Sequence, residues 1–347
     1  MTVYFITGTT GFLGGEILRT VLAQDSNAQC YCLVRDASQK KLVVDSDRVF
    51  PVVGDITLNH FGLNDDEYQA LAKKITHIIH SAAVVQFEKP KAFLESVNVQ
   101  GARNVIEFAK ACQQHNPDFK VLGHISTAYV AGQRLGKVKE QDFSAAHGFK
   151  NNYEASKFAS EQLMHEAKKN LPVIIFRPSI ILGHSETGYS LKSNVLFPTV
   201  QIIKKTPFSI LPLASNKNAL LDLVPVDYVA KGVYFLMRTP SAIGQTFHLT
   251  SGIGNEVSMK KMSQIYSQMY GIRFFFIPSF LWHLIRPILS LSKKGQYFAK
   301  GIGPFWVYCI ANPQYCNEET QKFLDLHAIN CNPMEDVLKK TLLFMQK

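Results

Sequence analysis

The feature that most constrains the fold lies at residues 3–24, which read VYFITGTTGFLGGEILRTVLAQ. An apolar stretch leads into Gly8, Gly11 and Gly14, and a helical pattern follows them. Glycines let the backbone approach a pyrophosphate closely, and the start of a helix offers free N–H groups and a positive dipole end. Glycine patterns are weak indicators when they stand alone, but between a strand and a helix this one predicts a dinucleotide-binding turn.

Four more apolar stretches follow at the spacing of a doubly wound fold: AQCYCLVRD, RVFPVVGDI, ITHIIHSAAVV and KVLGHISTAYV. Between the last two, NVQGARNVIEFAKAC has helical periodicity. Strands that alternate with helices predict a parallel sheet covered on both faces, with ligands beyond the carboxyl ends of its strands. We therefore predict an α/β fold with a Rossmann-type doubly wound parallel sheet over residues 1–182 and 222–250. Residues 183–221 and 251–347 would form a smaller, mainly helical C-terminal substrate cap in contact with it.

Two strand ends carry residues that bear on the cofactor. Arg35 ends the second stretch, where a carboxylate would bind the ribose 2′-hydroxyl of NAD, whereas an arginine suits the 2′-phosphate of NADP(H). The alternative for Arg35 is a solvated side chain at a strand end. Asp55, which follows VVG, either contacts the adenine side of the cofactor or belongs to a turn.

A second motif, NNYEASKFASEQLMHEAKK, predicts a helix entered from an Asn-rich turn, with Tyr153 and Lys157 on one face. Upstream, ISTAYV offers the hydroxyls of Ser126 and Thr127 at the end of a strand. Together these groups suit hydride transfer: a hydroxyl orients a carbonyl, and the phenol donates a proton to it. The ammonium would lower the phenol pKa and hold the nicotinamide ribose.

Several motifs occur in order between residues 3 and 250: FITGTTGFLG, HISTAYV, YEASKFASEQLM, LPVIIFRPSIILG and DLVPVDYVAKGV. With them the chain resembles the extended short-chain dehydrogenase/reductases, and more narrowly the thioester-reductase and fatty acyl-CoA reductase (male-sterility-like) branch. The resemblance implies NADPH-dependent reduction of an acyl-CoA or acyl-carrier thioester to an aldehyde or alcohol, with Thr127, Tyr153 and Lys157 as catalytic residues. The strand ends and the resemblance together give the expected cofactor contacts: Gly8, Thr10, Gly11, Phe12, Leu13, Gly14, Arg35, Asp55, Ile56, Ser81, Ala82, Ala83, Ser126, Tyr153, Lys157, Pro178, Ser179 and Ile180.

Other functions use the same residues. The main alternative is an NADP(H)-dependent ketone or hydroxyl oxidoreductase acting on a hydrophobic lipid- or sterol-like substrate. A non-catalytic NADP-binding sensor is disfavoured because all three catalytic candidates are present. A sugar-nucleotide epimerase is disfavoured because the C-terminal half is strongly aromatic and apolar. The sequence contains no adenylation or carrier domain, so we expect another molecule to deliver the thioester.

The formal net charge of +10 is concentrated in the C-terminal half, which has no acidic residue between Glu256 and Glu318. This stretch holds both tryptophans and several cations, among them Trp282, Lys293, Lys294 and Trp306. His283 and Arg286 interrupt its apolar run, which disfavours a membrane-spanning helix. Either the stretch packs on the core, or it walls an acyl-chain tunnel and touches an anionic membrane or an acidic carrier. No nucleic-acid motif is present.

The remaining features predict location and packing. The N-terminal MTVYFITG lacks the charged region of a signal peptide, and the six cysteines show no CxxC motif. We expect a cytoplasmic protein, with peripheral membrane contact as the second reading. Residues expected in the interior, without metal-ligand spacing, are His77, His80, His124, Cys30 and Cys32. Asp227 is expected to cap the helix that follows it.

Overall fold

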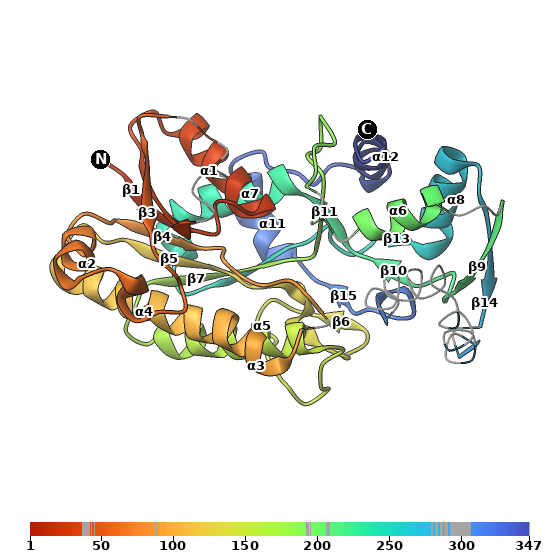
Figure 1. Ribbon diagram of the computed structural model, residues 1–347, viewed down its shortest axis with the longest axis horizontal. Helices are drawn as coiled ribbons and strands as arrows, with labels where there is room; N and C mark the ends of the chain where they lie inside the picture. The colour runs from red at the N-terminus through yellow and green to blue at the C-terminus, as the bar shows by residue number, and fades with distance from the viewer. Residues whose placement is uncertain are drawn as a thin grey trace.

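The computed structural model describes the chain in the following ranges: 1–36, 42, 44, 46–87, 89–191, 194, 196–205, 209–278, 280, 281, 284, 287, 291 and 307–346. These residues form a large sheet between helices, with a smaller group of helices and short strands beside it (Figure 1). The aromatic and basic residues for which we predicted membrane or carrier contact, Trp282, Lys293, Lys294 and Trp306, lie outside the described residues. Within the described residues, every helix is too short or too polar to cross a membrane.

Seven strands lie side by side in the large sheet, and all neighbours pair in parallel. In spatial order they are β12 (Thr246–Leu249), β7 (Val173–Pro178), β5 (Val121–Ile125), β4 (His77–His80), β1 (Val3–Thr7), β2 (Gln29–Val34) and β3 (Val49–Val53). The chain moves outward from β1 in one direction and from β4 in the other, so the strand order reverses between them. This is the predicted doubly wound sheet, and the reversal marks the place where such folds bind ligands.

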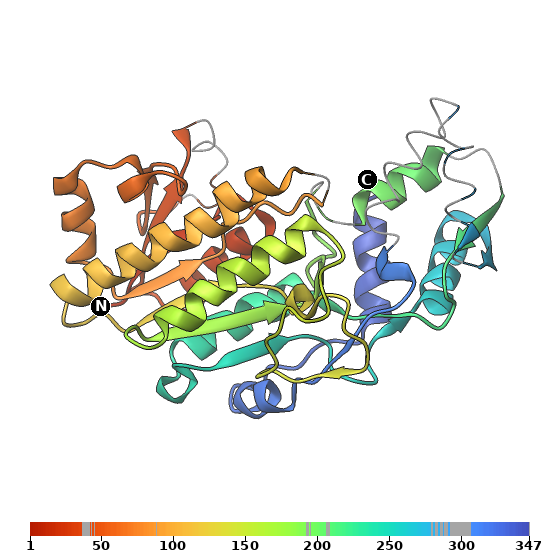
Figure 2. The same cartoon turned by 90° about the horizontal axis from the view of Figure 1, so that it is seen from below.

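Helices cover both faces of the sheet, as Figures 1 and 2 show. On one face lie α2 (Asp65–Ala72), α4 (Gln100–His115) and α5 (Asn152–Ala167), and on the other α1 (Phe12–Gln24), α7 (Val226–Met237) and α11 (Glu318–Asp325). On the first face Phe5 of β1 packs against Phe108 of α4, with ring centroids 4.7 Å apart. On the second face Ile17 and Tyr228 share an apolar cluster with Leu324 of α11. Burial on both faces explains why the central strands are mostly apolar.

A second apolar core lies beside the sheet. It is built from α6 (Phe197–Lys205), α8 (Met259–Tyr270) and α12 (Met334–Phe344), with the strand pairs β9 (Ile210–Ala214) and β14 (Arg273–Ile277), and β10 (Leu220–Leu221) and β13 (Val257–Ser258). These elements come from the stretches assigned to the cap, but α11, from the same stretches, packs on the sheet. The exact domain boundaries therefore stay a prediction.

Two short strand pairs and one buried carboxylate join the two parts. β8 (Ile180–Leu182) pairs with β11 (Leu223–Pro225), and β6 (Lys137–Val138) pairs with β15 (Gln314–Tyr315). The expectation that Asp227 caps α7 was wrong, because the helix begins at Val226 after Pro225, which places Asp227 inside the first turn. The Asp227 carboxylate instead accepts hydrogen bonds from the backbone N–H and the hydroxyl of Ser185, at 2.8 and 2.7 Å.

The residues expected in the interior are found there. Cys30 and Cys32 are completely buried in β2, and His77, His80 and His124 are buried in β4 and β5. The His80 ring makes a 2.9 Å hydrogen bond with the Thr7 hydroxyl, which ties β4 to β1. Burial lowers the pKa of His80 to about 3, so this ring stays neutral in the core.

Candidate active site

The glycine-rich turn joins β1 to α1 and needs its glycines for close packing. Gly8 has φ +82°, and a Cβ there would lie 2.7 Å from the backbone nitrogen of Ala82. A Cβ on Gly14 would collide with the carbonyl oxygen of Gly8. Gly11 is the N-cap of α1, so the first N–H groups of the helix face outward from a turn that has no side chain to cap them. This arrangement fits the pyrophosphate of a dinucleotide.

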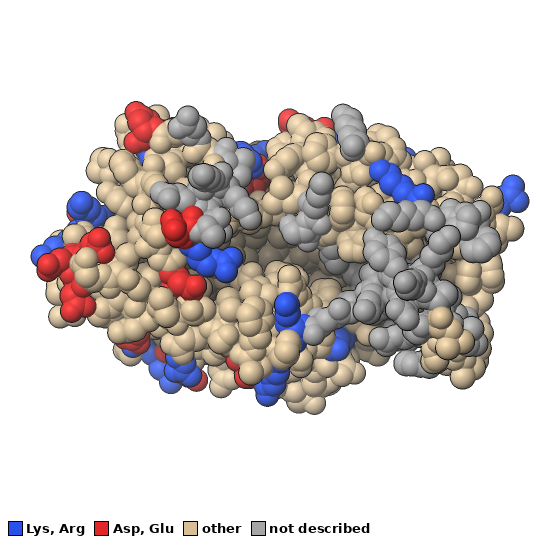
Figure 3. Space-filling view, in the orientation of Figure 1, with Lys and Arg blue, Asp and Glu red and all other residues tan. Residues whose placement is uncertain are grey.

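A cavity of about 470 Å³ opens at the carboxyl ends of β1, β4, β5 and β7. On the surface, a hollow lies near the middle of the face in Figure 3. Most of the expected site residues line the cavity: Gly8, Gly11, Phe12, Leu13, Gly14, Ser81, Ala83, Ser126, Thr127, Tyr153, Lys157, Pro178, Ser179 and Ile180. Segments that are far apart in the sequence therefore meet around one space, as the topology of the sheet requires.

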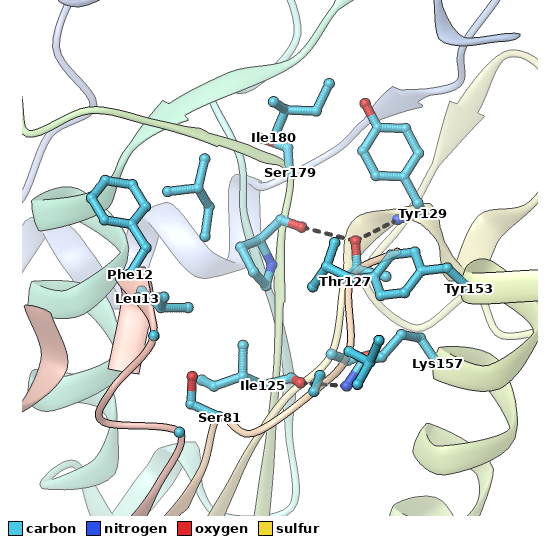
Figure 4. A pocket seen from close by; sticks show the side chains of 18 of the residues that line it. Phe12, Leu13, Ser81, Ile125, Thr127, Tyr129, Tyr153, Lys157, Ser179 and Ile180 are labelled. Atoms are coloured by element: carbon cyan, nitrogen blue, oxygen red, sulfur yellow. Dashed lines mark hydrogen bonds between the residues drawn. The ribbon is translucent and has the colours of Figure 1, made fainter. Parts of the chain in front are cut away.

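The three catalytic candidates lie together on one side of this cavity (Figure 4). Asn151 caps α5 by accepting a hydrogen bond from the Glu154 N–H, and the helix then carries Tyr153 and Lys157 on its cavity side. The Thr127 hydroxyl donates to the Pro178 carbonyl at 3.4 Å. The same hydroxyl accepts from the backbone N–H of Tyr129 at 3.3 Å.

The charge environment of Tyr153 differs from the expectation. Burial, followed by the nearby Glu154 carboxylate, raises the pKa of Tyr153, while the Thr127 hydroxyl acts in the opposite direction. The predicted lowering of the Tyr153 pKa by Lys157 is not found, and the Lys157 ammonium donates to the Ile125 carbonyl at 2.8 Å. Burial also lowers the pKa of Lys157 to about 8. At neutral pH the site therefore combines a neutral phenol with a cation.

A buried ion pair supports the floor of the cavity. Glu161, one helical turn after Lys157, accepts hydrogen bonds from Arg177 of β7, the shortest at 2.6 Å, and from the Ser126 hydroxyl. Burial acts to raise the pKa of Glu161, but the Arg177 charge and the hydrogen bonds outweigh it and lower the pKa to about 2. Ser126 thus lines the cavity while its hydroxyl is bonded to Glu161, which fixes the strand end next to Thr127.

Five expected cofactor contacts do not line the cavity: Thr10, Arg35, Asp55, Ile56 and Ala82. Arg35 is exposed at the end of β2, and the β1–β2 register pairs Thr7 with Leu33, so Arg35 lies alongside the glycine-rich turn. The Asp55 carboxylate accepts two 2.8 Å hydrogen bonds from Thr57. Asp55 therefore has the role of a turn residue, which is one of the two alternatives that the sequence left open. Their binding roles stay predictions.

Other residues line the cavity although the sequence did not single them out: Val84, Val85, Gln86, Phe87, Ile125, Tyr129, Ile181, Asn194 and Tyr308. β4 ends at His80, five residues before the end of the apolar run at Val85, so residues 81–87 form a loop over the cavity. Their position directly after a central strand was an available signal. Asn194 and Tyr308 lie outside every motif and gave no such signal.

The sheet order, the glycine-rich turn and the Tyr153–Lys157 helix define an extended short-chain dehydrogenase/reductase, and the protein is an NAD(P)-dependent reductase of this type. The chain belongs to the male sterility protein family, which it matches over residues 6–233. The sequence-based resemblance is confirmed.

Several solved structures have the same fold as this protein over nearly its whole chain. The terminal R domain from the myxalamid PKS-NRPS biosynthetic pathway superposes with a TM-score of 0.85 and 26% identity, covering 99% of this chain and 90% of that one. A thiolation-reductase di-domain from an archaeal non-ribosomal peptide synthetase has a TM-score of 0.76 at 23% identity, covering 99% and 75%. The UDP-glucuronic acid 4-epimerase of Bacillus cereus, with bound NAD, shares the fold with a TM-score of 0.70 at 15% identity, covering 99% of both chains.

Curated relatives are much longer proteins. A linear gramicidin synthase of Brevibacillus parabrevis is 30% identical over 70% of this chain, which corresponds to 5% of its own length. The aldehyde reductase lnaA of Aspergillus flavus is 28% identical over 71% of this chain and 25% of its own length. The chain spans about a quarter or less of the length of these two relatives.

Proposed function

We propose that the protein uses NADPH to reduce an acyl thioester to an aldehyde. The observation that carries this proposal is the meeting of Thr127, Tyr153 and Lys157 in one cavity beside a glycine-rich dinucleotide turn. The similarity to reductase domains of peptide and polyketide synthetases supports a thioester over other carbonyl substrates.

The residues that would hold the cofactor come from the sheet edge. The N-terminus of α1 and the turn at Gly8, Gly11 and Gly14 suit the pyrophosphate. Arg35, alongside this turn, suits a 2′-phosphate, which favours NADPH over NADH. The bound cofactor supplies a hydride to the carbonyl carbon of the substrate.

The side chains would handle the charge that develops on the carbonyl oxygen. Thr127 and Tyr153 orient this oxygen by hydrogen bonds, and Tyr153 donates its proton to it as the new C–H bond forms. The raised pKa of Tyr153 keeps the phenol protonated and able to donate. As the C–S bond breaks, the proton on this oxygen passes to the sulfur, which releases the thiol and leaves the aldehyde. The Tyr153 phenolate is then reprotonated from solvent, and Lys157, the cation of the site, holds the nicotinamide ribose.

We infer that the thioester is presented on a carrier. The archaeal relative combines a thiolation unit with its reductase unit, and the gramicidin relative is a synthase. A fatty acyl-CoA is the second thioester source. Onward reduction of the aldehyde to an alcohol would use a second NADPH at the same residues.

Reduction of a free carbonyl is the second candidate, since one relative is called an aldehyde reductase. The test follows NADPH consumption with a panel of acyl-carrier thioesters, acyl-CoAs, aldehydes and hydrophobic ketones, with Tyr153→Phe as the inactive control. We expect the highest kcat/KM with carrier thioesters and release of one thiol for each aldehyde formed. Turnover of ketones or aldehydes without any thioester reduction would replace the thioester proposal with the second candidate.

A further inference from the structure

The C-terminal part of the chain reaches the cavity through an aromatic side chain. Of the described residues after position 250, Tyr308 is the one that lines it. Its ring packs edge-on against Tyr129, with centroids 4.8 Å apart, and lies 5.7 Å from the ring of Phe87. Phe87 is in turn 5.7 Å from the ring of Tyr153. A continuous wall of rings therefore runs from the proton-donating phenol to the second apolar core.

The Tyr308 hydroxyl is anchored to the first turn of the catalytic helix. It donates to Glu154 Oε1 at 2.7 Å and accepts from the Asn151 side-chain amide at 2.8 Å. Glu154 is completely buried and is the neighbour of Tyr153 in the sequence. Its other carboxylate oxygen accepts from the backbone N–H of Lys150 at 2.8 Å. Because both partners belong to the start of α5, the Tyr308 ring is positioned with respect to Tyr153.

A lysine holds the chain on the far side of Tyr308. The Lys150 ammonium donates to the Ala311 carbonyl at 2.9 Å and to the Asn312 side chain at 2.8 Å. The same ammonium lies 4.8 Å from the centre of the Tyr308 ring. Asn312 continues the connection by donating to the Leu220 carbonyl, at the edge of the second core. The ring is therefore fixed from both ends, as a precise binding wall requires.

We propose that Tyr308 determines substrate specificity: with Phe87 and Tyr129 it forms a rigid apolar wall that limits the size of the group attached to the reacting carbonyl carbon. This inference rests on the proposed function and names its substrate class, an apolar acyl group that is narrow next to the carbonyl. A branched or aryl group at this point would have to displace a ring held by two hydrogen bonds. Rejection by such a wall is typically about 10- to 200-fold for a group that is one methylene too large.

The test compares kcat/KM for two N-acetylcysteamine thioesters, one with a linear hexanoyl group and one with a benzoyl group. Tyr308→Ala should raise the benzoyl to hexanoyl ratio by at least about tenfold, because the wall opens next to the carbonyl. Tyr308→Phe keeps the ring and should change the ratio less. The matched control is Tyr270→Ala, which truncates a tyrosine that packs against the second core but does not line the cavity.

The outcomes separate this inference from the proposed function. Hexanal and benzaldehyde are assayed in parallel, so a protein that reduces aldehydes but not thioesters still reports on the wall. A ratio that is unchanged in Tyr308→Ala, or equally changed in Tyr270→Ala, overturns the inference while leaving the function intact.

If neither thioesters nor aldehydes are turned over, the proposed function fails. Hydrogen exchange of residues 151–157 then tests whether the Tyr308 hydroxyl anchors the start of α5. Faster exchange in Tyr308→Phe supports the anchor, and unchanged exchange overturns it. Should Tyr308→Ala fail to fold, Tyr308→Leu replaces it.

Discussion

The parallel sheet and the second apolar core contribute to the cavity in different ways. The sheet supplies the glycine-rich turn, Thr127 and, through α5, Tyr153 and Lys157, all from strand ends or the helix packed on them. The second core shares Tyr129 and Tyr308 with the cavity wall. The groups proposed to carry out the chemistry therefore lie on a regular framework, the parallel sheet and the helix packed on it. Tyr129 and Tyr308, in contrast, lie in short 3-10 helices outside that framework.

The largest expected effect concerns the sheet side of this comparison. Tyr153→Phe removes the proton donor and should lower kcat by about 10²- to 10⁴-fold. The dissociation constant of NADPH should stay within about twofold, because the ring and the helix remain. Initial rates of thioester reduction give kcat, and fluorescence titration with NADPH gives the dissociation constant. Near wild-type kcat in this variant would mean that the proton comes from another group.

The second prediction concerns the buried ion pair on the sheet side of the cavity. Arg177→Leu leaves the Glu161 carboxylate buried without its cation and should lower the free energy of unfolding by about 3–5 kcal/mol. The control is Lys110→Ala, which breaks an exposed pair with Glu107 and should cost about 0.5 kcal/mol or less. Urea unfolding followed by circular dichroism gives both values. Similar losses in the two variants would show that the buried pair does not stabilise the sheet.

Cofactor selectivity comes next in size. Arg35→Ala should raise the dissociation constant of NADPH by about 10- to 100-fold, because a charge-assisted contact with the 2′-phosphate is worth about 1.5–3 kcal/mol. The constant for NADH should hardly change. Arg103→Ala removes an exposed arginine from α4, away from the cavity, and serves as the control. Equal affinities for NADH and NADPH in the wild type would rule out this role of Arg35.

The smallest expected effect is a pH dependence that separates two lysines. Burial lowers the pKa of both Lys157 and Lys168 to about 8, but only the first of these two lines the cavity. A lysine loses its charge as the pH rises through its pKa, so kcat/KM should fall by about tenfold per unit above pH 8. Lys168→Met should keep this profile. If the fall in kcat/KM above pH 8 disappears in Lys168→Met, the titrating group is Lys168 and not Lys157.

Local patterns were sufficient for much of the framework. The glycine-rich turn joins two consecutive elements, whereas each apolar strand and the Tyr153–Lys157 spacing lie within one, and the structure places them as predicted. A strand buried on both faces is mostly apolar, and residues four apart share a helix face, so these features are visible in the sequence. Asp227 shows the limit of such patterns, since a shift of two helical positions decided whether its carboxylate capped α7 or bound Ser185.

The sequence by itself therefore determined the sheet, its ligand-binding edge and the groups proposed for hydride transfer. Only the tertiary structure decided that Arg177 neutralises Glu161 under the cavity floor and that Tyr308 is anchored on Glu154 beside Tyr153. Tyr308 and Glu154 are 154 residues apart, and no periodicity links them. Their meeting depends on how two separately packed cores come together, which is a property of long-range burial and charge compensation and leaves no local trace in the chain.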